Sequence, residues 1–408
     1  MEMEIVLKKV IIMAASLVLI GLAGAPGSFA GDTIKVGFVD TYTGPASAFT
    51  LDVLDGFKMA IWQVNARGGV LGKKITFVTR DDRFTPDIAL AMAKELVFRE
   101  KVDILAGTLN SGSSLAVSGF ALREKIPFIV TYGKSDKISG EKGHRYVFMA
   151  TDNTQMAGRA AAVALAQKPF LTYWIAGDDY EYGHAIADDL WHQLKKLKPG
   201  VRKIGESWWK VETKDFAPYI TAILAARPDF IIGATGGFNM VHFQQAAKAA
   251  GLTKKIPFYQ HTGIELSTLE PQGRNAPAGV YGTANYLFYY PDTSENKAFV
   301  QAFRKHYNRS PKAGALYGYA VGLLLEKGYA RAGRADTEKL IDALEGLVIE
   351  SPAGPLEMRA CDHQLLLPMF FGVTKKSPLY PFLIAADLVT VSPQDYMMSC
   401  RDVMALRK

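Results

Sequence analysis

Two successive runs of alternating strands and helices constrain the fold of this chain of 408 residues more than any other feature. In the first run, short apolar stretches are separated by segments whose apolar residues recur at helical spacing, as Leu51, Leu54 and Phe57 do. The expected strands are 34–39, 74–79, 104–106 and 126–131, and the expected helices are 51–65, 86–99 and a segment ending at Glu124. Strict alternation predicts right-handed crossovers and a doubly wound parallel sheet.

The alternation restarts after Phe148 and predicts a second α/β lobe of similar length. Its expected strands are 171–176, 201–208, 229–233 and 256–260, and its expected helices are 155–166, 185–197, 216–225 and 240–250. The segments that remain are a strand at 279–285 and helices at 294–307, 315–332 and 337–344, which are too few for a third lobe.

The fold class is therefore α/β, with two doubly wound (Rossmann-like) lobes between which the chain crosses more than once. We assign residues 31–150 plus 281–360 to the first lobe and residues 151–280 plus 361–408 to the second. Parallel sheets bind ligands beyond the carboxyl ends of their strands, so two facing sheet edges predict a ligand cleft with a hinge.

The N-terminus has the pattern of a secretory leader. Lys8 and Lys9 precede an apolar run, and Ser28, Phe29 and Ala30 form a small-x-small cleavage site. We expect residues 1–30 to be a signal peptide that is removed on export. No cysteine lies near the cleavage site, so no lipid anchor is expected.

Composition excludes several classes of protein. Hydrophobic residues make up 49% and charged residues 21% of the chain, which is typical of a globular protein. The net charge is +7, but the basic residues form no dense stripe with interleaved aromatic residues, so no nucleic-acid partner is expected. We expect a monomer.

Cys361 and Cys400 are the two cysteines of the chain. A pair of cysteines in an exported protein most often forms one disulfide, which we predict here. Neither their number nor their spacing suits a metal site, and we expect no metal and no cofactor.

A polar loop follows the apolar run at 104–106 and leads into a helix. It contains Asn110, Ser111, Gly112 and Ser113, at a position where a helix leaves backbone N–H groups unpaired. Such a terminus can hold a carboxylate, because N–H and O–H donors meet the positive end of the helix dipole. The simpler interpretation is that Ser or Asn only caps the helix.

An exported enzyme is the alternative class. A glycine-rich stretch at 233–237 follows a strand but lacks the spacing of a dinucleotide loop, and a turn beside the cleft explains it equally well. The chain has no Walker loop, HExxH motif or GxSxG elbow, so we assign no catalytic residues.

Six segments together resemble the periplasmic binding proteins for leucine, isoleucine and valine. They are IKVGFVDTYTGPASAF at 34–49, NARGGVLGKKITFVTRDD at 65–82, DDYEYG at 178–183, AAKAAGL at 246–252, LIDALEGL at 340–347 and DHQLLLP at 362–368. The resemblance covers essentially the whole mature chain. It implies two lobes joined by a three-crossover hinge, a periplasmic location, ligand capture by hinge closure, and delivery to the membrane subunits of an ABC permease.

The resemblance also implies a ligand site. Ser111 and Ser113 would meet the carboxylate of the ligand, residues 132–135 (including Tyr132, Lys134 and Ser135) would complete that grip, and Tyr182 would close from the second lobe. Phe49 falls where the family often has an aromatic residue facing the ligand.

Two departures from the amino-acid binders concern the ligand. Residues 259–263 hold no carboxylate to pair with an ammonium group, and the first acidic residue is Glu265. Lys134 stands where a small hydroxyl residue is usual, and it either faces the cleft or lies on the surface. An unpaired buried ammonium is costly, so we favour an aromatic or other organic acid over an α-amino acid.

Phe238, His261 and Thr262 are expected to complete the pocket together with Phe49, Tyr132 and Tyr182, which would offer flat surfaces with polar tips. A protein that senses its ligand and docks on a membrane receptor, and a binder specific for amino acids, are the alternatives to this transport function.

Overall fold

A computed structural model describes residues 33–44, 46–211 and 213–407 of the chain. The expected signal peptide, residues 1–30, lies outside the described residues. Within the described ranges, no helix combines the length and the apolar character needed to cross a bilayer.

The first lobe is built on a five-stranded parallel sheet with the strand order β2-β1-β3-β4-β5. Its strands are β1 (Ile34–Asp40), β2 (Ile75–Asp81), β3 (Ile104–Gly107), β4 (Phe128–Val130) and β5 (Val147–Met149). Its helices are α2 (Ser47–Ala66), α3 (Pro86–Phe98), α4 (Ser111–Glu124), α10 (Ser294–Tyr307), α11 (Ala313–Ala332) and α12 (Thr337–Leu344).

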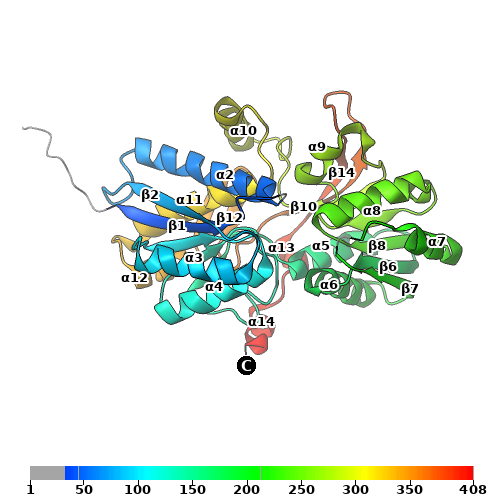
Figure 1. Cartoon of the computed structure of the whole chain (residues 1–408), viewed down its shortest axis with the longest axis horizontal. Coiled ribbons are helices and arrows are strands. Elements are labelled where there is room, and N and C mark those ends of the chain that lie inside the picture. Colours follow the sequence, from blue (N-terminus) through cyan, green and yellow to red (C-terminus); the bar gives the residue numbers. More distant parts are fainter. Residues whose placement is uncertain (1–32, 45, 212, 408) are drawn as a thin grey trace, which may run out of the picture. The chain divides into compact units, whose positions relative to one another are not determined.

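Helices cover both faces of this sheet, because neighbouring strand residues point to opposite sides. On one face of the sheet, Phe38 belongs to an apolar cluster with residues of α2 and α11. On the opposite face, Val39 belongs to a cluster with residues of α3 and α4. Figure 1 shows α2 and α11 on one side of β1 and α3 and α4 on the opposite side. The doubly wound arrangement predicted from the alternation is confirmed.

The second lobe has a seven-stranded sheet with the order β14-β13-β10-β9-β8-β6-β7. Its strands are β6 (Thr172–Asp178), β7 (Arg202–Trp209), β8 (Phe230–Ala234), β9 (Phe258–Gln260), β10 (Val280–Ala284), β13 (Met369–Lys375) and β14 (Ile384–Val391). Its helices and 3-10 turns are α5 (Thr154–Ala166), α6 (Glu181–Leu197), α7 (Ala217–Ala226), α8 (Gly237–Ala249), η1 (Leu252–Lys254), α9 (Leu266–Gln272) and η2 (Gly273–Asn275).

This sheet is also covered on both faces. Ile232 packs in the cluster that includes α5 and α6, whereas Ile231 packs in the cluster that includes α7 and α8. β13 and β14 pair antiparallel at one edge, which the alternation does not predict. A separate hairpin, β11 (Val348–Ser351) with β12 (Gly354–Glu357), was likewise not predicted.

The chain passes between the two lobes at three places: 150–153 after β5, 285–293 after β10, and 358–368 before β13. Because β10 belongs to the seven-stranded sheet, the return to the first lobe begins after Ala284 rather than at residue 281.

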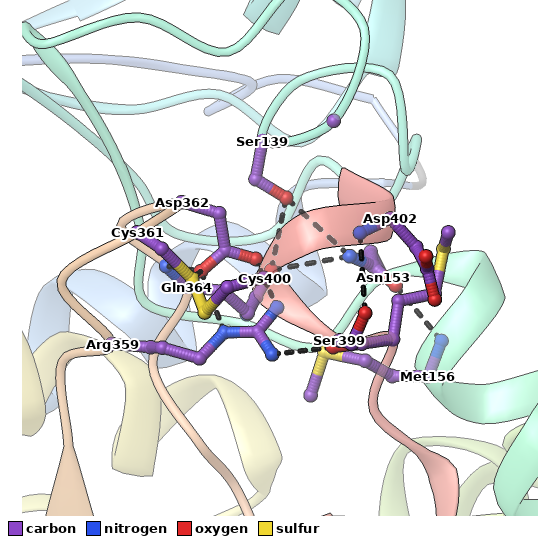
Figure 2. Close-up of polar contacts among 12 residues, drawn as sticks. Ser139, Asn153, Met156, Arg359, Cys361, Asp362, Gln364, Ser399, Cys400 and Asp402 are labelled. Carbon is purple, nitrogen blue, oxygen red and sulfur yellow. Dashed lines mark hydrogen bonds and ion pairs between the residues drawn. A yellow bond between two sulfur atoms is a disulfide. The ribbon is translucent and has the colours of Figure 1, made fainter. Parts of the chain in front are cut away.

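Hydrogen bonds join these crossings to one another. The Gln364 side chain donates to the Thr151 carbonyl over 2.7 Å and accepts from Ser139 and Asn153 over 3.3 and 3.2 Å. Figure 2 shows the Ser139, Asn153 and Gln364 side chains converging. The Asn285 amide, on the second crossing, donates to the Pro368 carbonyl of the third over 3.1 Å.

The C-terminal segment turns back from the second lobe toward the first. After β14 it forms α13 (Pro393–Tyr396) and α14 (Cys400–Leu406). The predicted disulfide between Cys361 and Cys400 is confirmed and lies at the start of α14 (Figure 2). Arg359 donates to the Met398 carbonyl over 2.7 Å, and Arg407 donates to the Ser139 carbonyl over 2.7 Å.

Candidate functional site

The loop between β3 and α4 begins at a glycine and ends in a helix cap. Gly107 has a φ of +119°, and a Cβ there would lie 2.2 Å from the Val39 carbonyl oxygen, so only glycine fits. Asn110 caps α4, because its side chain accepts the Ser113 N–H over 3.1 Å. The cap is therefore supplied by Asn110, and the serine hydroxyls are not needed for it.

The hydroxyls of Ser111 and Ser113 differ in what they contact. Ser111 Oγ accepts the Ser135 N–H over 3.2 Å, which ties the start of α4 to the loop after β4. Ser113 Oγ is buried and has no hydrogen-bond partner among the described residues, and the same holds for Ser135 Oγ. Gly112 lies exposed in the first turn of α4, where a side chain would crowd the Asn110 cap.

Lys134 points into the protein rather than to the surface. Its side chain is 8% exposed, and its Nζ lies 2.6 Å from Oδ1 of Asp152. It also lies 5.5 Å from the ring centre of Tyr132 and 5.8 Å from that of Tyr317, within the range of cation–π attraction. Of the two alternatives left open for this lysine, the structure favours the inward one.

Asp152 is a central residue of the site that sequence reasoning missed. It follows β5 on the first crossing and is fully buried. Burial alone would raise the pKa of its carboxyl, but the charge of Lys134 and the nearby imidazole of His261 outweigh burial and hold that pKa well below its usual range. The Tyr317 hydroxyl donates to the same carboxylate over 3.1 Å.

The second lobe contributes His261 and Tyr182. His261 lies in the loop after β9 with its Nε2 3.4 Å from Oδ2 of Asp152 and its Nδ1 2.5 Å from the Tyr182 hydroxyl. Burial and the charge of Lys134 lower the pKa of His261, so its imidazole is neutral at neutral pH. With the proton assigned to Nε2, facing Asp152, Nδ1 accepts from Tyr182. Polar contacts thus run from α6 through His261 and Asp152 to Lys134.

Aromatic rings surround this polar chain. Phe49 packs edge-on against Tyr132 with 5.5 Å between ring centres, and Tyr132 packs edge-on against Tyr317 at 5.4 Å. Tyr182 stacks on His261 with 5.9 Å between centres. Burial raises the pKa of Tyr132, Tyr182 and Tyr317 well above that of free tyrosine, so all three hydroxyls remain protonated donors.

Two predicted site residues of the second lobe remain, Thr262 and Phe238. Thr262 is half-buried, and its hydroxyl lies 3.8 Å from the Met240 sulfur. Phe238 belongs to α8, and its side chain lies outside what the structure describes.

Glu265 is a second carboxyl group that sequence reasoning did not assign to the site. It is 2% exposed and accepts a hydrogen bond from the Ser267 hydroxyl over 3.1 Å. Burial raises its pKa to about 7, with the charge of Asp152 adding to this effect and that of Lys134 opposing it. The signal that could have found it was its position as the first acidic residue after the strand at 256–260.

The arrangement holds hydroxyl and amide donors together with buried aromatic and carboxyl groups, which can bind a small molecule. No cluster of histidine, cysteine and acidic side chains that could hold a metal ion occurs among the described residues.

Known proteins resemble this chain in sequence and in fold. A family model described as periplasmic binding protein matches residues 33–377. The leucine-, isoleucine-, valine-, threonine- and alanine-binding protein of Pseudomonas aeruginosa is 28% identical over 333 residues, which cover 81% of this chain and 86% of that protein.

Solved structures share the fold at lower identity. A solute-binding protein of an ABC transporter from Rhodopseudomonas palustris, in complex with benzoate, has a TM-score of 0.76 at 23% identity and covers 88% of this chain and 98% of its own. A second one from that organism, in complex with 4-hydroxybenzoate, has a TM-score of 0.78 at 24% identity and covers 88% and 97%.

Proposed function

This chain belongs to the periplasmic binding protein family, and on that premise we propose that it captures a small carboxylate and delivers it to an ABC permease. Proteins of this family bind small molecules and work with such permeases. We further propose that the ligand is an aromatic or other organic acid rather than an α-amino acid, and that the chain reaches the periplasm through cleavage after Ala30.

The observation that carries the proposal is a pair of buried hydroxyls, one from Ser113 in the first turn of α4 and one from Ser135, whose backbone N–H donates to Ser111 of the same turn. Ser113 Oγ and Ser135 Oγ are shielded from solvent and have no partner among the described residues. Buried polar groups are nearly always hydrogen-bonded in proteins, so two such donors beside a helix N-terminus support a carboxylate as their partner. The dipole of α4 adds a partial positive charge at the same point.

Charge balance supports an acid without an ammonium group. Asp152 already contacts Lys134 through one oxygen and faces His261 with the other. The charge of Asp152 is therefore balanced by Lys134, and its Oδ2, although without a hydrogen-bond partner among the described residues, faces the imidazole of His261. The rings of Phe49, Tyr132 and Tyr182 supply the flat apolar surfaces that suit an aromatic acid.

Hinge closure would follow from contacts that only the closed state makes. Besides His261 with Asp152, two ion pairs join elements of the different lobes: Lys137 with Glu181 at 2.7 Å, and Lys312 with Glu270 at 2.7 Å. A ligand that touches both lobes favours the closed state by its difference in affinity for the two states.

A binder of amino acids is the second candidate. It is favoured by the named ligands of the Pseudomonas aeruginosa relative and by the carboxyl of Glu265, which could meet an ammonium group from the second lobe.

A thermal-shift screen separates the two candidates, because a ligand that binds only the folded state raises the melting temperature. The panel contains benzoate, 4-hydroxybenzoate, 4-methyl-2-oxopentanoate and leucine, with glucose as a control. We expect the acids without an amino group to stabilise the protein more than leucine does. Stabilisation by leucine alone would replace the organic acid with an amino acid, and stabilisation by no carboxylate would overturn the proposal.

A further inference from the structure

We propose that Glu265 is the specificity-determining residue of the second lobe, and that it acts as a neutral carboxylic acid that donates a hydrogen bond to a hydroxyl oxygen at the end of the ligand remote from its carboxylate. This inference rests on the proposed function and deepens it, because it names the ligand class as hydroxylated acids.

The position of Glu265 in the chain places it at the site. It ends the loop between β9 and α9, and His261 begins that loop with its contacts to Asp152 and Tyr182. Leu266, the next residue, packs in the apolar cluster that contains Tyr132 and Tyr317. The backbone on both sides of Glu265 is therefore anchored to residues of the site.

The partners of Glu265 favour its neutral form. In the described part of the chain its side chain has one hydrogen bond, from the Ser267 hydroxyl, and no basic side chain within 4.0 Å of its oxygens. Asp152 differs, since it has Lys134 at 2.6 Å. A buried carboxylate without a cation is costly, so the proton stays on Glu265 and gives it an O–H donor that Ser267 does not use.

The charged and titratable groups that face Glu265 lead to the same conclusion. They are the charges of Lys134 and Asp152 and the hydroxyls of Tyr132, Tyr182, Tyr317 and Tyr259, and His261 begins the same loop as Glu265. The tyrosines are protonated and His261 is neutral, so the charge balance involves Lys134 and the carboxyl groups alone. Lys134 neutralises Asp152, and a ligand carboxylate adds one more negative charge. Ionised Glu265 would add a further charge that nothing balances.

Two measurable consequences follow. A hydroxylated acid should bind more tightly than the same acid without its hydroxyl, because a site that is built to hydrogen-bond an OH loses that bond with the analogue. Binding should also take up a proton above about pH 7, where free Glu265 becomes ionised, so affinity for the acid should fall by up to about tenfold per pH unit. Burial raises the pKa of Glu265 to about 7, which agrees with the pH range in which this proton uptake is expected.

Isothermal titration calorimetry tests both consequences on the mature chain. The probes are 4-hydroxybenzoate and benzoate, and two buffers of different ionisation enthalpy at about pH 8 report the number of protons exchanged. We expect 4-hydroxybenzoate to bind at least about tenfold more tightly than benzoate, with uptake of most of one proton.

Three variants locate the effect. Glu265→Gln keeps a hydrogen-bond donor but cannot titrate, so it should retain the preference for 4-hydroxybenzoate and lose the proton uptake. Glu265→Leu should lose both. Asp189→Asn is the matched control, because burial also raises the pKa of Asp189 to about 7 but its side chain packs against Gly158 of α5; this variant should keep both effects.

The outcomes separate this inference from the proposed function. Equal affinity for benzoate and 4-hydroxybenzoate, or proton uptake that persists in Glu265→Gln, would overturn the role of Glu265 and leave capture of an acid intact. Binding of leucine with proton release at about pH 6, where free Glu265 is protonated, would make Glu265 the ammonium partner instead. Failure of 4-hydroxybenzoate to bind would contradict the inference even if other acids stabilise the protein, and failure of every acid would contradict the proposed function as well.

Discussion

The ammonium group of Lys134 lies 2.6 Å from Oδ1 of Asp152, and both side chains are buried. Lys134 follows β4, whereas Asp152 lies on the first crossing between the lobes. The pair therefore ties the proposed carboxylate site to the hinge. In the proposed site a ligand carboxylate would meet a cation that is already neutralised, so we expect the hydroxyls of Ser113 and Ser135 to provide most of the selectivity for an acid.

Removing one charge of this pair should destabilise the protein more than removing both charges. Lys134→Met leaves the Asp152 charge buried without its partner, and we expect a loss of about 3 to 5 kcal/mol in the free energy of unfolding. The double variant Lys134→Met with Asp152→Asn should recover much of that loss. Urea denaturation of wild type, Lys134→Met, Asp152→Asn and the double variant measures this coupling. A double variant that is as unstable as the sum of both single changes would show that the two side chains do not interact.

Ser113→Ala should weaken ligand binding without changing stability. Its hydroxyl has no partner among the described residues, so its removal costs the folded protein little, whereas the loss of a donor to a carboxylate costs about 1.5 to 3 kcal/mol of binding. Ser114→Ala is the matched control on the same helix. The Ser114 hydroxyl lies 2.7 Å from that of Thr108 and donates to the Asn110 carbonyl, so its loss should lower stability by about 1 kcal/mol. Unchanged affinity in Ser113→Ala would remove this residue from the site.

The stability of the ligand-free protein should depend on Glu265 at mildly acidic to neutral pH. Burial raises its folded-state pKa to about 7, whereas an unfolded glutamate titrates near about 4.3. Because the folded state holds this proton more tightly, the stabilisation is complete below the unfolded pKa and is lost as pH rises through about 7.

Glu265→Gln should therefore flatten the curve of unfolding free energy between about pH 5 and 8, by an amount on the order of 3 kcal/mol. Glu206→Gln, on an exposed strand position where the carboxylate pairs with Lys203, should follow the wild-type curve. Parallel curves for wild type and Glu265→Gln would mean that Glu265 is ionised in the folded protein across this range.

The disulfide should hold the C-terminal segment in place. Cys361 lies on the third crossing and is joined to Cys400 at the start of α14 (Figure 2). The bond closes a loop that contains β13 and β14. We expect the double variant Cys361→Ser with Cys400→Ser to lose about 2 to 4 kcal/mol of stability. Limited proteolysis should then cut between β14 and the C-terminus first. An unchanged melting temperature in reducing agent would show that the hydrogen bonds of Arg359 and Arg407 suffice to hold the C-terminal segment in place without the disulfide.

The fold could be predicted from sequence where local pattern decides it. Alternating strands and helices identified both lobes, and the loop before α4 was recognisable because polar residues at a helix start have a local physical role. β5 has only three residues and was not assigned, and the antiparallel strands β13 and β14 carry no crossover helix that would mark them.

The site was less predictable, because its chemistry depends on pairs that are distant in sequence. The inward direction of Lys134 depends on Asp152. Asp152 was not assigned to the site, because the short strand before it, β5, was not predicted. Tyr317 lies in a helix rich in apolar residues, where nothing in the local pattern indicates that its hydroxyl reaches the Asp152 carboxylate. Such contacts follow from tertiary packing, which periodicity does not report.

A crystal structure of the mature protein with the panel acid that stabilises it most would test carboxylate capture at α4 most directly. We predict that the ligand carboxylate accepts hydrogen bonds from Ser113 Oγ, Ser135 Oγ and backbone N–H groups at the start of α4, with the ring between Phe49, Tyr132 and Tyr182. A carboxylate bound elsewhere, with the hydroxyls of Ser113 and Ser135 away from the ligand, would contradict this assignment.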